Sequence, residues 1–329
     1  MNERERIELL RGVLASGAAT GGGAQALVGI GDDAAVLDLG GTRLAWSVDV
    51  AVEDVHFRRG WLTLRQLGFK SAMAALSDLA AMAARPCGVL SSLVLPPELS
   101  DDELSELAAG QKEACEALGT QVVGGNLARG AALSITTGVL GVVGPHLLER
   151  QGAKPGDRLW AAGPLGLAAA GVAALEGGAD RDDPVLAPAL AAWRAPQARL
   201  DEALAVAAAA HAGIDVSDGL ALDAARLCAP TGVEGAGLKV VLDAESILGS
   251  DLVAAARRLG QDPLELALHG GEDYALLVAA PAGLEVAGLR SIGHFVPAEP
   301  AEAPVWLLAD GVAEPVVARG FDHFGSEPE

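Results

Sequence analysis

The sequence repeatedly places aspartates at the ends of short apolar segments. Two adjacent carboxylates, Asp32 and Asp33, stand in the glycine-flanked turn GIGDDAAV at 29–36. Comparable aspartates occur in WSVD at 46–49, LSDL at 76–79 and IDVSDG at 214–219. A carboxylate that such flanks bury must be paired, protonated or bound to a metal ion. Because only 23 Lys and Arg accompany 44 Asp and Glu, metal ions are the expected partners.

The segment 214–219 joins a strand-like run to a helical one. Ser217 or Asp218 is therefore expected at the helix N-cap. Asp215 should emerge at the same strand end as Ser217, because side chains alternate along a strand. This combination favours an ion or phosphate site. Asp78 lies within an apolar helical pattern, so it is a ligand candidate only in company with the other aspartates.

Glycines provide a second indication of phosphate chemistry. VVGGN at 122–126 follows a strand pattern and HGGEDY at 269–274 precedes one. Glycine lets the backbone approach a phosphate group closely. The sequence contains no GxxxxGK[ST] and no strand-associated GxGxxG. Neither a P-loop nor a Rossmann dinucleotide site is therefore expected.

Composition narrows the class of protein. A formal net charge of −21 argues against nucleic-acid partners, which need a basic face. The cysteines, Cys87, Cys115 and Cys228, show no CxxC spacing, so reduced and buried thiols are expected. The charged N-terminus lacks the apolar core of a secretory signal, and no apolar run is long enough to cross a bilayer. The sequence predicts a cytoplasmic protein without membrane partners.

The elements that would position these side chains alternate along the chain. Apolar patterns predict strands at 42–52, 89–95, 120–123, 133–143, 158–162, 240–242 and 274–278. Helices are predicted at 63–84, 100–118, 165–175, 196–210, 218–228 and 252–259, with an acidic loop at 177–188. Ser100 and Glu103 form a capping box for the second helix. A turn-rich linker near residue 150 divides two α/β domains, 1–148 and 149–329.

Taken together, the motifs resemble the thiamine-monophosphate kinase family. This family shares a superfamily with aminoimidazole ribonucleotide synthetase and selenophosphate synthetase. The resemblance spans nearly the whole chain, in order and spacing, through GIGDDAAVL (29–37), SVDVAVEDVHF (47–57), LSDLAAMAARP (76–86), GGN (124–126), GAKPGD (152–157), IDVSDGL (214–220), GGEDY (270–274) and GFDHF (320–324). It implies a PurM-like architecture of mixed sheets, in which an N-terminal ATP- and Mg-binding domain dimerises through its strands and precedes a C-terminal α/β domain.

The resemblance also implies roles for individual residues. It implies several magnesium ions held by Asp33, Ser47, Val48 through its carbonyl, Asp49, Asp78, Asn126, Asp215 and Asp218. Of these, Asp33, Asp49, Asp78 and Asp218 are the expected catalytic residues. ATP would contact Gly125, Asn126, Arg150 and Ser217. Thiamine monophosphate would contact His56, Glu272 and Phe321.

The implied activity is ATP-dependent phosphorylation of thiamine monophosphate to thiamine diphosphate, the last step of thiamine diphosphate biosynthesis. The γ-phosphoryl group would pass in line to the substrate phosphate with magnesium assistance, in a cytoplasmic homodimer. Two alternatives remain open: a superfamily enzyme with another acceptor, and a non-catalytic nucleotide- or metal-binding relative. Selenophosphate synthesis is disfavoured, because that enzyme uses an N-terminal cysteine or selenocysteine and the first cysteine here is Cys87.

Overall fold

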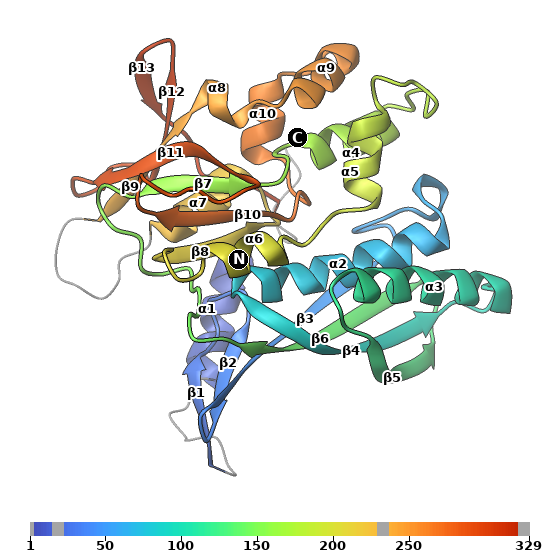
Figure 1. Ribbon diagram of the computed structural model, residues 1–329. Helices are drawn as coiled ribbons and strands as arrows, with labels where there is room; N and C mark the ends of the chain where they lie inside the picture. Colours follow the sequence, from blue (N-terminus) through green and yellow to red (C-terminus); the bar gives the residue numbers. More distant parts are fainter. Residues whose placement is uncertain (1–2, 15–22, 229–236, 322–329) are drawn as a thin grey trace.

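The protein, seen in a computed structural model that describes residues 3–14, 23–228 and 237–321, folds around two β-sheets (Figure 1). The N-terminal half of the chain builds a six-stranded sheet and the C-terminal half a seven-stranded sheet. In Figure 1 the first lies in the lower half of the molecule and the second in the upper half. The expected α/β class with mixed sheets is confirmed.

The N-terminal sheet is antiparallel except for one parallel pair. Its strands are β1 (Ala24–Val28), β2 (Ala35–Leu39), β3 (Thr42–Val52), β4 (Ala84–Leu95), β5 (Val122–Arg129) and β6 (Ser134–Val143). They follow the order β1-β2-β3-β6-β4-β5, with β4 parallel to β5. The helical elements of this half are α1 (Glu3–Leu14), η2 (Arg59–Trp61), α2 (Leu64–Ala81) and α3 (Asp101–Ala117). Both α2 and α3 cover one face of the sheet (Figure 1).

Helix α2 is the element that both halves share. A capping box between Thr63 and Gln66 starts it, as Ser100 and Glu103 start α3. Its small residues allow close packing: a Cβ on Gly68 would lie 2.0 Å from the Leu107 carbonyl oxygen of α3. The helix packs on β3, β4 and β6 below it and on strands of the C-terminal sheet above it. It is therefore buried over most of its length.

The C-terminal sheet comprises β7 (Arg158–Ala162), β8 (Ala212–Val216), β9 (Leu238–Asp243), β10 (Ala275–Ala280), β11 (Leu289–Pro297), β12 (Val305–Ala309) and β13 (Val312–Pro315). Their order is β13-β12-β9-β11-β7-β10-β8, with β9 and β12 parallel. The helices are α4 (Leu167–Glu176), α5 (Ala187–Arg194), α6 (Leu200–Val206), α7 (Leu220–Leu227), α8 (Ala244–Ile247), α9 (Ser250–Leu259) and α10 (Pro263–His269). Strand β8 is an edge strand, yet it is buried along its length because α2 packs against it.

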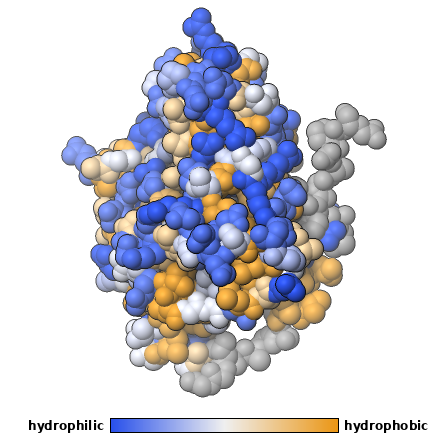
Figure 2. All heavy atoms as spheres, turned by 90° about the vertical axis from the view of Figure 1, so that its right-hand side faces the viewer, coloured by the Kyte–Doolittle hydropathy of each residue, from blue (hydrophilic) through white to orange (hydrophobic). Residues whose placement is uncertain are grey.

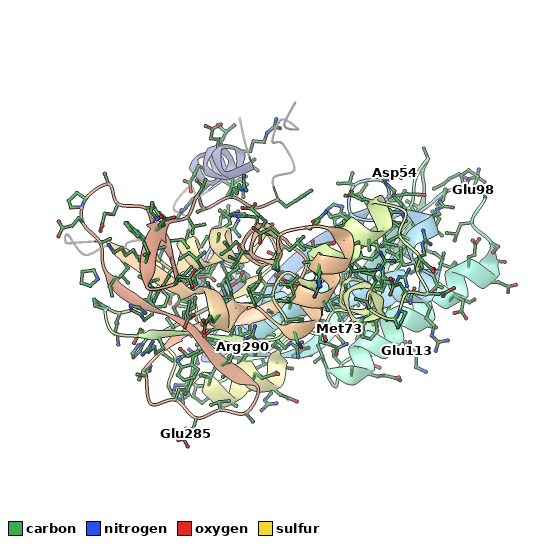
Figure 3. The ribbon with its side chains drawn as sticks, turned by 90° about the horizontal axis from the view of Figure 1, so that it is seen from above. Asp54, Met73, Glu98, Glu113, Glu285 and Arg290 are labelled. Carbon is green, nitrogen blue, oxygen red and sulfur yellow. The ribbon has the colours of Figure 1, made fainter. Side chains whose placement is uncertain are left out.

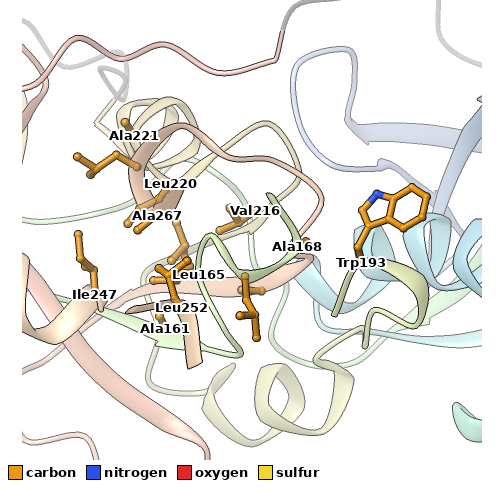
Figure 4. Close-up of a cluster of buried hydrophobic side chains, with 14 of the residues drawn as sticks. Ala161, Leu165, Ala168, Trp193, Val216, Leu220, Ala221, Ile247, Leu252 and Ala267 are labelled. Carbon is orange, nitrogen blue, oxygen red and sulfur yellow. The ribbon is translucent and has the colours of Figure 1, made fainter. Parts of the chain in front are cut away.

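The main hydrophobic core fills the space between the C-terminal sheet and its helices. Figure 4 shows part of it, with Trp193 of α5 at one side of the cluster. Phe57, from the segment after β3, joins the same core and so ties the two halves together. In the view from above, Met73 of α2 lies between Glu113 on α3 and Glu285 in the loop before β11 (Figure 3). No described helix has the length and apolar composition needed to cross a bilayer.

Several expectations are corrected. The helix expected at 196–210 is only Leu200–Val206, because residues 196–199 form a loop before it and residues 207–209 a turn after it. The acidic loop expected at 177–188 ends where α5 begins at Ala187. Cys115 and Cys228 are buried free thiols as expected, but Cys87 is exposed, at the point where the register of β4 against β6 shifts.

Helices α2 and α3 leave the other side of the N-terminal sheet uncovered, and we call it the outer face. Side chains alternate between the two faces along each strand, so every second residue points away from the helices. Many of these outward-pointing residues are apolar. The exposed members are Trp46, Val48, Val50, Leu90, Val123 and Val142. Figure 2 shows hydrophobic side chains gathered in the lower part of the molecule, the part in which this sheet lies.

Candidate active site

Three carboxylates from three distant segments meet where the two halves of the molecule touch. Asp33 lies in the turn before β2, Asp78 near the C-terminal end of α2, and Asp215 in the buried strand β8. One oxygen of each lies within 4.8 Å of the others. Asp33 Oδ2 is buried and has no hydrogen-bond partner among the described residues. The site therefore has the donor set and the unpaired oxygen that a hard cation requires.

Burial and mutual repulsion both act on these groups. Burial raises the pKa of Asp78 well above its usual range, and the charges of Asp215 and Asp33 raise it further. Asp215 behaves similarly, because burial and the charge of Asp33 raise its pKa well above normal. Burial also raises the pKa of Asp33, although Arg150 offsets part of the rise. A divalent cation would relieve this clustered negative charge.

Arg150 is a protein cation that pairs directly with the cluster. Its guanidinium group forms an ion pair with Asp33 Oδ1, to which Nε donates at 3.1 Å. Asp32 lies behind the pair and accepts hydrogen bonds from the backbone N–H groups of Asp33 at 2.9 Å and Arg150 at 3.1 Å. Burial first, and the charge of Asp33 second, raise the pKa of Asp32 to about 6. Asp32 thus supports the turn while Asp33 faces the cluster.

Strand β3 lines the cluster from the N-terminal sheet. Ser47 Oγ donates to Asp78 Oδ2 at 2.5 Å and lies 3.1 Å from the Asp33 carbonyl oxygen. Asp49, on the same face of β3, is half-buried and close enough for its charge to raise the pKa of Asp78. Val48 lies between them, and its side chain points to the outer face. Ser77, next to Asp78, donates to Asp215 Oδ2 at 2.7 Å.

The turn after β8 differs from the expected helix cap. Gly219, with φ 127°, occupies the N-cap of α7, so neither Ser217 nor Asp218 caps the helix. The fully buried Asp223, in the first turn of α7, instead holds the preceding turn, because its Oδ2 accepts from the N–H groups of Asp218 and Gly219. Burial raises the pKa of Asp223 to about 7. Arg226 pairs with both Asp223 and Asp218, which keeps the Asp218 carboxylate beside the acidic cluster.

A second polar group surrounds Glu272, in the loop before β10. Glu272 Oε1 lies 3.1 Å from Lys70 Nζ of α2, and its Oε2 accepts from the Trp193 indole N–H. The Glu272 backbone takes a left-handed φ of 67°, and its N–H donates to the Ser217 carbonyl oxygen at 2.8 Å. The loop is thereby fixed against the turn that carries Asp218.

The remaining residues that were expected to contact substrates lie in different parts of the structure. Phe321 lies beside the cluster, because its N–H donates to the Asp218 carbonyl oxygen at 3.0 Å. His56 is half-buried in the turn after β3, and its Nδ1 accepts from the Val52 N–H. Gly125 and Asn126 lie on the edge strand β5, separated from β3 by β6 and β4. At a strand spacing of about 4.8 Å, that separation is roughly 14 Å within one chain.

Sequence reasoning missed four residues of this site. Ser77, Lys70, Asp223 and Trp193 all bond directly to an expected site residue. The position of Lys70 in the sequence could have indicated its role. It is the one basic residue inside the apolar part of α2, and it lies seven residues before Ser77 and eight before Asp78. Asp223 lies five residues after Asp218, but only the fold shows that it points back toward the turn.

Comparisons with known proteins identify similar sequences and structures. Residues 31–143 match the model of the AIR synthase related protein, N-terminal domain. The thiamine-monophosphate kinase of Mycobacterium tuberculosis (strain CDC 1551 / Oshkosh) is 36% identical over 310 residues, which cover 93% of this chain and 88% of that protein. The Aquifex aeolicus (strain VF5) thiamine-monophosphate kinase is 32% identical over 253 residues, 77% of this chain and 80% of that protein.

Comparison with solved structures also finds similarity to a ThiL protein. The structure of AaThiL complexed with AMPPCP and TMP superposes with a TM-score of 0.86 at 29% identity, covering 98% of this chain and 97% of that one. The hydrogenase maturation protein HypE, at 19% identity and a TM-score of 0.67, shares the fold and covers 86% of this chain.

The two mixed sheets have a PurM-like architecture, and residues 31–143 match the AIR synthase related N-terminal domain. Among proteins of this architecture the chain belongs to the thiamine-monophosphate kinase family, a family of enzymes.

Proposed function

We propose that this enzyme transfers the γ-phosphoryl group of ATP to thiamine monophosphate and releases thiamine diphosphate and ADP. The observation that carries the proposal is the convergence of Asp33, Asp78 and Asp215 with one Asp33 oxygen left unpartnered. Family membership supports the choice of substrates, because a similar solved structure is described as complexed with AMPPCP and TMP.

Magnesium ions fit this site. The donors are all oxygens, which Mg²⁺ prefers, and the three carboxylates carry more negative charge than Arg150 can neutralise. Asp33, Asp78 and Asp215 would hold the ions, together with Ser47, the Val48 carbonyl, Asp49 and Asp218. Bound Mg²⁺ would neutralise the phosphate charges and orient the reacting groups.

The chain's own residues would bind and orient the two substrates. Arg150 is placed to contact phosphate oxygens once Asp33 has another cation partner, and Ser217 lies at the turn beside Asp215. Glu272, His56 and Phe321 would contact the thiamine part of the acceptor. The acceptor phosphate has a second pKa of about 6, so it is mostly a dianion near pH 7. It can attack the γ-phosphorus in line without a strong protein base, so the carboxylates of the site can serve to hold metal ions.

We also propose a homodimer that buries the outer face of domain 1–148, while domain 149–329 closes the site from above. Six large apolar side chains on this face are between 41% and 65% exposed in a single chain. Such a contiguous patch is typical of a protein interface. Pairing through this face is also the arrangement in which Gly125 and Asn126, remote from the cluster of their own chain, could act at the partner's site.

An acceptor panel tests the proposed activity. Purified protein would receive ATP and Mg²⁺ with thiamine monophosphate, free thiamine, or another phosphate monoester such as pyridoxal phosphate. We expect thiamine diphosphate from the first acceptor and at most a trace of product from the others. Equal turnover of another phosphorylated acceptor would overturn the assignment, and ATP binding without any product would favour a non-catalytic relative.

A further inference from the structure

Lys70 is a buried lysine in a region otherwise dominated by acids. Its side chain is 6% exposed, and Nζ lies 3.1 Å from Glu272 Oε1 and 3.0 Å from the Trp193 carbonyl oxygen. The ammonium group also lies over the Trp193 ring, 4.8 Å from its centroid, and 5.7 Å from the centroid of Tyr274. A lysine is rarely buried unless its charge is compensated, and here Glu272 provides the compensating charge.

The contacts fix both oxygens of the Glu272 carboxylate. Lys70 holds Oε1 and the Trp193 indole N–H holds Oε2. The Glu272 side chain is still 27% exposed, so part of the carboxylate faces outward. Each carboxylate oxygen can accept more than one hydrogen bond. Glu272 is therefore held in one orientation while it keeps acceptor capacity for a ligand.

The tryptophan is itself held from the N-terminal half. Trp61 of η2 packs edge-on against Trp193, with 5.8 Å between ring centroids. Arg194, next to Trp193, donates from Nε to the Trp61 carbonyl oxygen at 3.0 Å. Lys70 and Trp61 come from one half of the molecule, and Glu272 and Trp193 from the other. The orientation of Glu272 thus depends on contacts across the boundary between the halves.

Helix α2 and the Glu272 loop also connect this group of residues to the acidic cluster. Lys70 and Asp78 lie on one side of α2, eight residues and about 12 Å apart along the helix axis. The Glu272 loop is bonded to the turn that follows Asp215. The boundary between the halves therefore has two anchor points: carboxylates suited to metal and phosphate at one, and a fixed carboxylate acceptor at the other. A phosphate ester whose ring carries an amino group or positive charge at its far end would match both.

We propose that Lys70 is a positioning residue that orients the Glu272 carboxylate toward the ring of the phosphate-bearing acceptor, and so sets affinity for that acceptor. This role rests on the proposed function, because it assigns the ring of thiamine monophosphate to the Glu272 end of the site. Lys70 acts through Glu272 and takes no part in phosphoryl transfer.

Steady-state kinetics on the full chain test this role. In Lys70→Met we expect the KM for thiamine monophosphate to rise at least tenfold, with the KM for ATP within twofold and kcat within about threefold of wild type. Lys70→Arg keeps a cation and should recover most of the affinity. The matched control is Lys112→Met, which removes a lysine from an exposed pair with Glu116 on α3 and should change nothing.

A double variant separates positioning from general support of the fold. Because Lys70 acts through Glu272, the double variant Lys70→Met/Glu272→Gln should show the same acceptor KM as Glu272→Gln alone. It also leaves no unpaired buried charge, so the comparison holds even where Lys70→Met fails to fold. Losses that multiply in the double variant, or an unchanged acceptor KM in folded Lys70→Met, would overturn the proposal.

A spectroscopic readout is independent of turnover. In protein labelled with ¹⁵N-tryptophan, the Trp193 indole signal, assigned with Trp193→Phe, should shift in Lys70→Met without substrate and stay in place in Lys112→Met. An unmoved signal would overturn the coupling between Lys70 and Glu272. Wild-type protein without any turnover of thiamine monophosphate would instead overturn the proposed function, and with it the acceptor role of Lys70.

Discussion

Single side chains at the centre of this protein are placed at a cost to its stability. Asp33, Asp78 and Asp215 are buried close together, and each has a pKa raised by burial. Uncompensated buried carboxylates oppose folding unless they are protonated or bound to a cation. A functional site that destabilises the metal-free protein is the expected result.

This conflict yields a prediction for Asp78→Asn. The amide keeps an oxygen that can accept from Ser47 but removes one of the repelling charges. Without Mg²⁺, in chelator at pH 7.5, the variant should be more stable than wild type by about 1 kcal/mol in urea unfolding. With Mg²⁺, its kcat should fall at least about 100-fold, because a group that holds charge-neutralising metal is lost.

The control for this prediction is Asp201→Asn, which replaces an exposed acid at the start of α6 and should leave both quantities unchanged. A destabilised Asp78→Asn protein with near-normal turnover would contradict the assigned role of the cluster.

The sequence predicted the positions of these aspartates well because their flanks are short and regular. Asp215 and Ser217 at a strand end and Asp78 within a helix all lie where the patterns indicated. The partners were not predictable in the same way. Lys70 meets Glu272 across about 200 residues of sequence, and neither helical nor strand periodicity carries information on such a contact.

At the scale of elements, helix ends and tight loops set the geometry. Asp273 caps α4: its two carboxylate oxygens accept from the N–H groups of Gly166 and Ala168. Burial raises its pKa to about 7. The loop 270–274 thus orients Glu272 on one side and begins a helix of the C-terminal core on the other. The capping boxes of α2 and α3 show that local signals of this kind are strong where all partners are close in sequence.

Asp273 predicts a pH dependence of stability. Its folded pKa, near 7, exceeds the unfolded value of about 3.9, so the unfolded chain loses this proton first as pH rises. The contribution is therefore full below pH 4 and is lost as pH rises through 7. Between pH 5.5 and 8.5, the stability advantage of wild type over Asp273→Asn should shrink by about 2 kcal/mol in urea unfolding. An advantage that stays constant or grows would contradict the raised pKa.

The strands that the sequence failed to predict have an irregular pattern of buried and exposed side chains. Strands β1 and β13 are short edge strands with mostly exposed side chains, and β2 and β12 lie next to them and are only partly buried, so burial leaves little alternation in their sequences. The central strand β11 was also not predicted, and its alternation is interrupted by a register shift against β7 between Ser291 and Gly293. Helix α6 is shorter than expected because the chain forms a loop at 196–199 and a turn at 207–209, although alanine itself favours a helix. Central strands such as β3 and β7 were predicted with their observed bounds, because both lie between neighbours and bury one face.

At the scale of the whole molecule, two regions are suited to binding other molecules: the boundary between the two sheets and the outer face of the N-terminal sheet. In the proposed function the boundary between the two sheets binds the substrates, and the outer face of the N-terminal sheet exposes apolar side chains. Charge alone could not locate either, because −21 is spread over the entire chain. The architecture was predictable through motif order, whereas the separation of Asn126 from the aspartates became visible only in the strand order.

The outer face predicts a dimer that a single charge disrupts. Leu90, 50% exposed, lies in the middle of this face, beside Gly138 and one strand from Val48. Light scattering should give wild type twice the 33.1 kDa mass of the chain, and Leu90→Glu the mass of one chain. The reason is that burying an unpaired carboxylate in an apolar interface is unfavourable. Val312→Glu, at the exposed edge strand β13, should stay dimeric, and a monomeric wild type would contradict this interface.

The central claim is that the acidic boundary site passes a phosphoryl group directly to a substrate phosphate. The most direct test incubates purified protein with γ-³²P-labelled ATP, Mg²⁺ and thiamine monophosphate and follows the label. The label should appear in thiamine diphosphate in a 1:1 ratio with ADP, and only when Mg²⁺ and thiamine monophosphate are both present. ADP formed with the label in inorganic phosphate, or in no thiamine product at all, would contradict the account.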